Sequence, residues 1–175
     1  RVLFRSGDLK TLIAKTIFAV ATDDARPILK GELFEINDNQ ICGVTLDGFR
    51  LAMVNKTIEN SHGSYKVLVP ARSLGEVNKL LPDNDEIIKV FVSDNYVKFD
   101  LIDSILTSRL IEGDFFNYKQ IIHNNFTTSV TVNREQLLKV IDRACILSKV
   151  DRNNLVKFDI KENVLTITAN SESAN

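Results

Sequence analysis

Cysteine is scarce in this chain of 175 residues: only Cys42 and Cys145 occur, and they are far apart in the sequence. Neither belongs to a Cys-x-x-Cys pair, so the sequence predicts no zinc site and no disulfide framework. Isolated thiols are typical of proteins from a reducing compartment. We therefore expect a cytoplasmic protein.

Glycine and histidine are also sparse, with seven and two residues respectively. The sequence has no glycine-rich phosphate loop, no His-Glu-x-x-His zinc pair and no Gly-x-Ser-x-Gly nucleophile motif. His62 and His123 lie in polar segments that are typical of solvated loops. The sequence therefore predicts no catalytic residue, no metal site and no cofactor.

Long apolar runs are absent as well. No stretch approaches the roughly 20 apolar residues that a membrane helix requires, and no charged-then-apolar leader opens the chain. Methionine occurs once, as Met53, and the chain starts at Arg1. We therefore expect no membrane association, and we expect the sequence to be a piece of a longer one.

The composition is that of a globular protein, with 44% hydrophobic and 26% charged residues. Such values exclude a disordered or a fibrous chain. Lys and Arg number 22 against 23 Asp and Glu, for a net charge of -1. This balance excludes a polybasic nucleic-acid binder, but it leaves open how the charge is distributed over the surface.

Apolar residues at helical spacing mark three expected helices, over residues 9–20, 71–81 and 134–149. The first and third stripes have the same spacing at a constant offset of 128. Segments of strand character lie around each helix, so a repeat of strand, helix and three strands recurs along the chain. The expected strands are residues 28–36, 41–46, 49–54, 65–69, 87–93, 96–101, 105–111, 127–132, 155–160 and 164–169.

Polar residues stand where two of these helices begin. Ser6 or Asp8 is expected to cap the first helix, because a side-chain oxygen there accepts from a first-turn N–H. Asn133, with Gln136 three residues later, resembles a capping box before the third helix.

The repeats also predict the domain organisation. One repeat alone exposes an apolar face of its sheet, and a second repeat beside it covers that face. We therefore expect an α+β fold with helices on one face of antiparallel sheets. The first two repeats form a complete domain over residues 1–123, and the third repeat forms the first half of another domain over residues 124–175.

The expected helices carry a net charge of +5, which leaves -6 on the rest of the chain. If the repeats place their helices on a common side, that side is basic. Neutralisation of phosphates by Lys and Arg is the sequence-independent part of DNA binding. Solvated helices of many ordinary domains also carry lysine, so the charge alone leaves both explanations open.

Within these repeats, three segments occur in order at residues 26–31 (RPILKG), 44–52 (VTLDGFRLA) and 110–118 (LIEGDFFNY). Together they resemble the bacterial DNA polymerase III β subunit family, the sliding clamps, and the resemblance extends over essentially the whole chain. It implies the DNA clamp fold, with this chain covering the middle domain and the first half of the third. It also implies a non-catalytic, ring-shaped homodimer that encircles duplex DNA.

The resemblance further implies that the replicative polymerase, the clamp loader and repair proteins bind through short linear peptides. Their site in the family is an apolar pocket between the middle and third domains. The residues at the matching positions are Leu29, Leu46, Gly48, Phe49, Arg50, Leu51, Phe116, Gln120 and Ile121.

A basic surface facing double-stranded DNA is implied as well. Its candidates are Lys10, Lys15, Arg26, Arg72, Lys79, Lys139, Arg143, Lys149 and Arg152.

Several residues depart from the pattern of the family. Leu46 stands where the family commonly has threonine, and Phe49 where it has histidine. Gln120 replaces a frequent basic residue, and Phe116 and His123 replace the usual prolines. The first two changes make the pocket more apolar, so its peptide preference is expected to differ. An enzyme or small-molecule-binding protein, with a cleft between repeats, stays open as the alternative class.

Overall fold

The computed structural model describes residues 1–175 except 24, 62, 83, 124, 149–154 and 170–175. The contacts divide the chain into an N-terminal unit, Arg1–Lys119, and a C-terminal unit, Gln120–Asn175. The elements of the N-terminal unit are β1 (Val2–Arg5), α1 (Ser6–Thr16), η1 (Ile17–Ala19), η2 (Pro27–Lys30), β2 (Gly31–Asn37), β3 (Gln40–Leu46), β4 (Leu51–Thr57), β5 (Asn60–Ser61), β6 (Tyr65–Pro70), α2 (Ala71–Leu80), β7 (Ile87–Val92), β8 (Tyr96–Asp100) and β9 (Ile105–Arg109).

The described strands of the N-terminal unit form two antiparallel sheets, ordered β4-β3-β2-β6 and β5-β1-β7-β8-β9. Each sheet combines three consecutive strands of one repeat with the first strand of the other, because β6 pairs with β2 and β1 pairs with β7. The short β5 is a fifth strand of the second sheet, beside β1. The two repeats therefore exchange their first strands, which the periodicity of the sequence does not predict.

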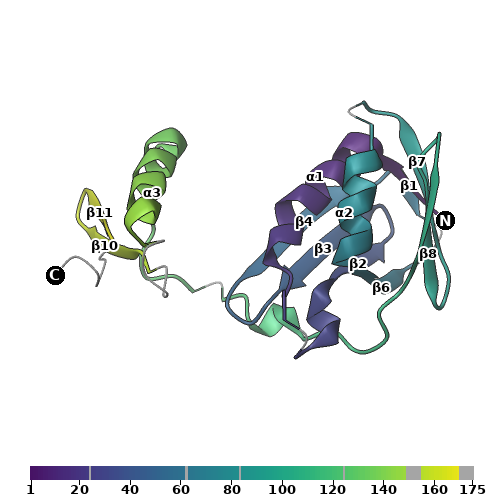
Figure 1. Ribbon diagram of the computed structural model, residues 1–175, viewed down its shortest axis with the longest axis horizontal. Helices are drawn as coiled ribbons and strands as arrows, with labels where there is room; N and C mark the ends of the chain where they lie inside the picture. The colour runs from purple at the N-terminus through teal and green to yellow at the C-terminus, as the bar shows by residue number, and fades with distance from the viewer. Residues whose placement is uncertain (24, 62, 83, 124, 149–154, 170–175) are drawn as a thin grey trace. The chain divides into compact units, whose positions relative to one another are not determined.

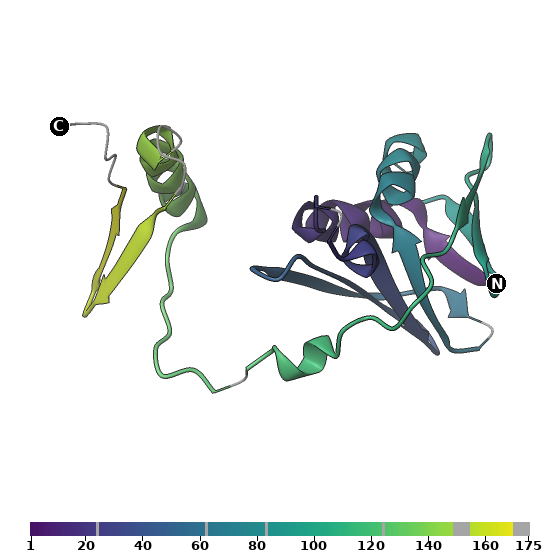
Figure 2. The same ribbon diagram turned by 60° about the horizontal axis from the view of Figure 1, so that its bottom comes forward.

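The predicted α+β fold with helices on one face of antiparallel sheets is confirmed. α1 packs on β3 and β4, α2 packs on β2 and β6, and the two helices contact each other (Figure 1). Figure 2 shows both helices on the same side of the strands. Leu9, Leu12 and Ile13 of α1 and Leu74 and Val77 of α2 are buried in one core that both repeats share.

The C-terminal unit contains the third repeat, with α3 (Arg134–Ser148) beside a hairpin of β10 (Lys157–Lys161) and β11 (Val164–Thr168) (Figure 2). η3 (Tyr118–Gln120) precedes it and spans the boundary between the two units. The predicted strand over residues 127–132 is not formed. Its counterpart β1 pairs with β7 of the following repeat, and the described residues contain no repeat after the third.

Two further local predictions are wrong. Residues 28–30 belong to the 3-10 helix η2 and not to a strand, because the fixed φ of Pro27 suits the first residue of a helical turn. Ser6 does not cap α1: its hydroxyl donates to the carbonyl oxygen of Asn84 in the second repeat, and Asp8 pairs with Lys56 at 2.7 Å.

The cap predicted for the third helix is confirmed. The Asn133 Oδ1 atom accepts from the backbone N–H groups of Glu135 at 3.0 Å and Gln136 at 3.1 Å. This contact is local in the sequence, so it requires no residue of another repeat.

Glu32 places a carboxyl group inside the core, with 0% of its surface exposed. Its Oε1 atom accepts from the Thr16 hydroxyl at 2.7 Å, whereas Oε2 has no hydrogen-bond partner among the residues described. Gly43 leaves the space for this carboxyl, since a Cβ there would lie 2.5 Å from Oε1 and 2.7 Å from Cδ2 of Leu12. Burial raises the pKa of Glu32 to about 8, against a smaller lowering by the Thr16 hydrogen bond.

This pKa predicts an unusual pH dependence of stability. Between pH 4.5, the ordinary pKa, and about 8, the folded chain keeps the Glu32 proton and the unfolded chain loses it. The free energy of unfolding should therefore fall by a few kcal/mol across this range and then level off. The free energy of unfolding can be measured by urea titration at several pH values. In Glu32→Gln its decrease between pH 4.5 and about 8 should largely disappear. Glu35→Gln, three residues along the same strand, should keep this pH dependence; a Glu32→Gln profile identical to the parent would contradict this assignment.

Candidate peptide-binding surface and DNA-facing helices

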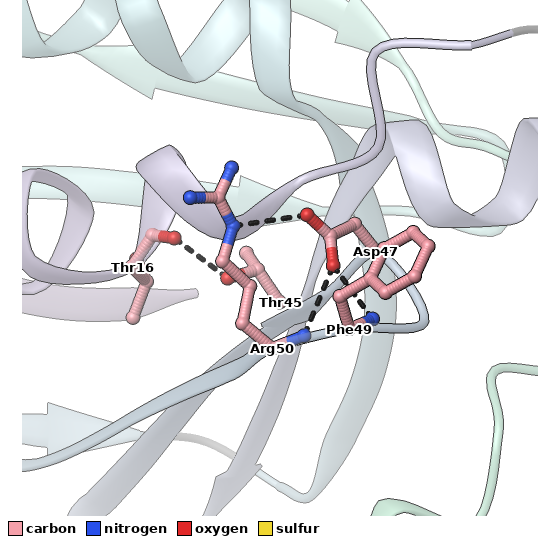
Figure 3. A network of polar contacts seen from close by, with 5 residues as sticks. All are labelled: Thr16, Thr45, Asp47, Phe49 and Arg50. Carbon is pink, nitrogen blue, oxygen red and sulfur yellow. Dashed lines mark hydrogen bonds and ion pairs between the residues drawn. The ribbon is translucent and has the colours of Figure 1, made fainter. Parts of the chain in front are cut away.

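The turn between β3 and β4 presents three of the predicted pocket residues. Asp47 Oδ1 accepts from the backbone N–H of Phe49 at 3.0 Å and of Arg50 at 3.1 Å. Asp47 Oδ2 accepts from Arg50 Nε at 2.9 Å. Gly48 has a φ of 96°, a conformation that glycine adopts without strain. One carboxylate thus holds the backbone of the turn and orients the arginine (Figure 3).

This turn points its two large side chains in different directions (Figure 3). The Phe49 side chain is 100% exposed. The Arg50 guanidinium lies 5.8 Å from the ring centroid of Phe18, which is itself 58% exposed. The hydrogen bonds from the Phe49 and Arg50 backbone hold the pKa of Asp47 below its ordinary value. Asp47 is therefore ionised near neutral pH, as its ion pair with Arg50 requires.

Three other pocket candidates, from η2, β3 and β4, belong to one apolar cluster of the N-terminal unit. Leu29 and Leu46 are buried in it, at 1% and 5% exposure, and Leu51 packs against it half-buried. Leu46 and Leu51 face each other across the β3–β4 hairpin. Of these three leucines, Leu51 therefore has the most surface open to a ligand.

Phe116 is a further exposed aromatic residue of the N-terminal unit. It is 43% exposed, whereas its neighbour Phe115 is buried in the apolar cluster. The Arg26 guanidinium lies 5.9 Å from the centroid of the Phe116 ring. Arg26, which was predicted to face DNA, directly precedes η2 and is not on a helix.

Tyr118 of η3 is hydrogen-bonded to strand β2 of the sheet β4-β3-β2-β6. Its hydroxyl donates to Glu35 Oε2 at 2.7 Å and lies 3.8 Å from the Cys42 sulfur. Burial raises the pKa of Glu35, but the Tyr118 hydrogen bond and the charges of Lys119 and Lys66 outweigh it, so the pKa is lowered overall. Burial and the contact with Glu35 raise the pKa of Tyr118, which therefore stays a donor. The chain is thus anchored directly before the C-terminal unit.

Gln120 and Ile121 follow Tyr118 in the chain, and both are exposed residues of the C-terminal unit.

Two residues of this region, Phe18 and Tyr118, were not singled out by the periodicity of the sequence. Phe18 lies off the apolar stripe of the first helix, which is the one local signal that it is a surface aromatic. Tyr118 gave no such signal, because its partner Glu35 is 83 residues away.

The basic residues of α1 and α2 differ in how they are held. Lys15 and Arg72 are exposed, and Lys79 is exposed and paired with Glu76 at 2.9 Å. Lys10 is partly buried and its Nζ donates to the carbonyl oxygen of Leu81 at 3.2 Å, just beyond α2. Lys10 thereby links the two helices.

On α3, Lys139 and Arg143 are exposed, whereas Lys149 and Arg152 lie outside the described residues. The observed helix bounds also change the charge count. α1 includes Asp8 and α3 ends before Lys149, so each helix carries +1 and the sum is +3 instead of the expected +5. The net charge of the three helices is therefore smaller than predicted, but it is still positive.

The part of the chain that the structure describes contains no group of three or more His, Cys, Asp or Glu side chains that could hold a metal ion. It also contains no helix that is long and apolar enough to cross a membrane.

Comparison with known proteins identifies both units. Residues 4–117 match the family described as DNA polymerase III beta subunit, central domain, and residues 119–175 match its C-terminal domain. The Beta sliding clamp of Bacillus subtilis is 34% identical over 154 residues, which are 87% of this chain and 41% of that protein. The Beta sliding clamp of Staphylococcus aureus is 31% identical over 163 residues, 93% of this chain and 43% of that protein.

Solved structures agree with these matches. The sliding clamp of Bacillus subtilis aligns with a TM-score of 0.93 at 32% identity, over 98% of this chain and 46% of that one. A clamp from Pseudomonas aeruginosa bound to griselimycin aligns with a TM-score of 0.91 at 27% identity, over 99% of this chain and 47% of that one. The chain thus spans less than half of these relatives. Since the central-domain match alone covers more than half of its residues, the chain belongs to the DNA polymerase III beta subunit family.

Proposed function

We propose that this chain is part of a DNA sliding clamp, a non-catalytic processivity factor of the replicative DNA polymerase in the cytoplasm. The observation that carries the proposal is the match of both units, in order, to the central and C-terminal domains of one family. In this proposal residues 1–123 are the complete middle domain and residues 124–175 the first half of the third. The complete protein is a homodimeric ring around duplex DNA.

The helices would face the DNA inside such a ring. Lys15 and Arg72 are exposed on α1 and α2, and Lys139 and Arg143 on α3. Each helix carries only +1, so the attraction to phosphates is weak and spread out. Weak contacts to phosphates carry no base readout, which suits a ring that slides. The tether is then the closed ring itself and not the strength of the contacts.

Partners would bind where the β3–β4 turn, Phe18 and the apolar cluster meet. Leu51 and Phe49 offer apolar contact, and Arg50, held by Asp47, offers a positive charge for an acidic or polar peptide group. In this proposal the replicative polymerase, the clamp loader and repair proteins use this surface. The clamp from Pseudomonas aeruginosa that was solved with griselimycin supports ligand binding by this fold.

The topological part of the proposal predicts how the complete protein behaves on DNA. Once loaded by a clamp loader onto nicked circular DNA, it should stay bound through gel filtration in high salt, because release requires opening of the ring. Cutting the circle once should release it, since the ring slides off an end. Retention on the linear DNA would contradict topological binding, and loss from the circle at high salt would indicate ordinary ionic binding.

The peptide part predicts the effect of single substitutions in the complete protein. Arg50→Ala should weaken binding of a fluorescein-labelled polymerase peptide about tenfold in fluorescence anisotropy, because it removes a charge oriented by Asp47. Gly48→Val should also weaken binding, since valine disfavours a φ of 96°. Arg109→Ala and Gly63→Val are matched controls: Arg109 is exposed in an ion pair, and Gly63 has a φ of 104°. Unchanged binding by both pocket variants would place the peptide site elsewhere.

A further inference from the structure

Glu32 lies against the end of α1, in the interior of the N-terminal unit. Its Oε1 atom is 2.7 Å from the hydroxyl oxygen of Thr16, the last residue of the helix, and both residues are 0% exposed. The same hydroxyl oxygen is 2.8 Å from the carbonyl oxygen of Leu12. A hydroxyl has one proton, so both short contacts are hydrogen bonds at the same time only when Glu32 supplies a second proton.

Two further features of this position favour the neutral carboxyl group. The Oε2 atom has no hydrogen-bond partner among the residues described, and a buried charge without a donor is far more costly than a buried neutral carbonyl. The carboxyl group also meets the C-terminal end of α1, where the helix dipole is negative and disfavours an anion. The raised pKa of Glu32 agrees with both features. The geometry around Glu32 is therefore that of a protonated carboxyl group.

Charged groups of the described residues do not offset this environment. Burial raises the pKa of Glu32 and the Thr16 hydrogen bond lowers it, whereas no charged group contributes, Lys30 of the preceding η2 included. On β3, Cys42 is uncharged near neutral pH, because burial and, less strongly, the charge of Glu32 raise its pKa. The titratable residues of α1, α2 and β6 are exposed or bonded to other groups: Asp8, Lys10, Lys15, Tyr65, Lys66, Arg72, Glu76 and Lys79.

Thr16 connects Glu32 to the candidate peptide surface. Its carbonyl oxygen accepts from the buried Thr45 hydroxyl at 2.6 Å, near the end of β3 (Figure 3). η1 begins at the next residue and carries Phe18, whose ring lies 5.8 Å from the Arg50 guanidinium. Thr16 is therefore held by Glu32 on one side and by the strand of the peptide turn on the other.

η1 is a weak element, so the position of Phe18 depends on how Thr16 is held. The backbone hydrogen bond at the end of η1 spans 3.4 Å, and 3-10 turns have poorer hydrogen-bond geometry than α-helices. Ionised Glu32 would take the Thr16 proton away from the Leu12 carbonyl oxygen. It would also draw water to Oε2, because a buried charge requires a donor. Both changes would loosen the end of α1, from which η1 continues.

We propose that protonated Glu32 is a positioning residue for the peptide surface, and that loss of its proton weakens peptide binding by releasing Phe18 from Arg50. The inference rests on the proposed function, because it concerns the same peptide surface. When Glu32 ionises, its proton leaves to solvent and the Thr16 hydroxyl turns from the Leu12 carbonyl oxygen to the carboxylate. The affinity for partner peptides is therefore highest below the pKa of Glu32, about 8, and falls as the pH rises through it.

The first test measures the affinity of the complete protein for a rhodamine-labelled polymerase peptide without His or Cys, by fluorescence anisotropy. The dissociation constant should rise about tenfold from pH 7 to pH 9, since about a tenth of a group with a pKa of about 8 is protonated at pH 9. In Glu32→Gln, which keeps a donor toward Thr16, the dissociation constant should not change with pH. Glu35→Gln and Cys42→Ser are matched controls that should keep the change. A parent without this pH dependence, or a Glu32→Gln variant that retains it, would overturn the proposal.

The second test follows Phe18 itself and does not depend on peptide binding. In fluorine NMR of the complete protein labelled with para-fluorophenylalanine, the Phe18 signal, assigned from Phe18→Leu, should shift with a midpoint at about pH 8. This shift should be absent in Glu32→Gln. A parent that binds no peptide at any pH would refute the proposed function, while the Phe18 shift would still report the positioning by Glu32. A Phe18 signal that is the same in the parent and in Glu32→Gln across this pH range would overturn the inference alone.

Discussion

The exchange of first strands between the two repeats is the constraint on which the N-terminal unit depends. β1 is hydrogen-bonded to β7 and β6 to β2, so neither sheet is complete without a strand from the other repeat. The exchange also joins the apolar faces of both repeats into one core, to which α1 and α2 contribute. Both helices are thereby held against each other on one side of the sheets. A common helical face is thus a consequence of how the strands pair.

The candidate peptide surface lies on the sheet β4-β3-β2-β6, which includes the exchanged strand β6. β3 ends in the turn that Asp47 holds, and the Thr45 hydroxyl donates to the carbonyl oxygen of Thr16 at 2.6 Å, which links β3 to the end of α1. Phe18 follows directly in η1 and receives the Arg50 guanidinium. Tyr118, bonded to Glu35 of β2, ends the N-terminal unit on this sheet. The candidate surface is therefore built on strands whose positions the strand exchange determines. Its turn residues Phe49 and Arg50 are exposed, whereas Leu46 is buried.

The sequence predicted the features that depend on neighbours along the chain. Apolar stripes located α1, α2 and α3, and Asn133 was identified as a cap because its partners are two and three residues away. The predictions failed where the partner is distant. Ser6 bonds to Asn84, 78 residues away, and residues 127–132 form no strand among the described residues. The pocket residues came from resemblance to the family, whereas Phe18 and Tyr118 became visible only in three dimensions.

Native-state hydrogen exchange of the 175-residue chain tests the exchange of strands most directly. If the exchanged strands hold the N-terminal unit together, amides of β1, β6 and α1 should all exchange through one global unfolding event. Their opening free energies should then be equal and should fall with denaturant at the same slope. If β1 or β6 opens at a clearly lower free energy while the amides of α1 stay protected, the repeats are stable without the exchange and the account is contradicted.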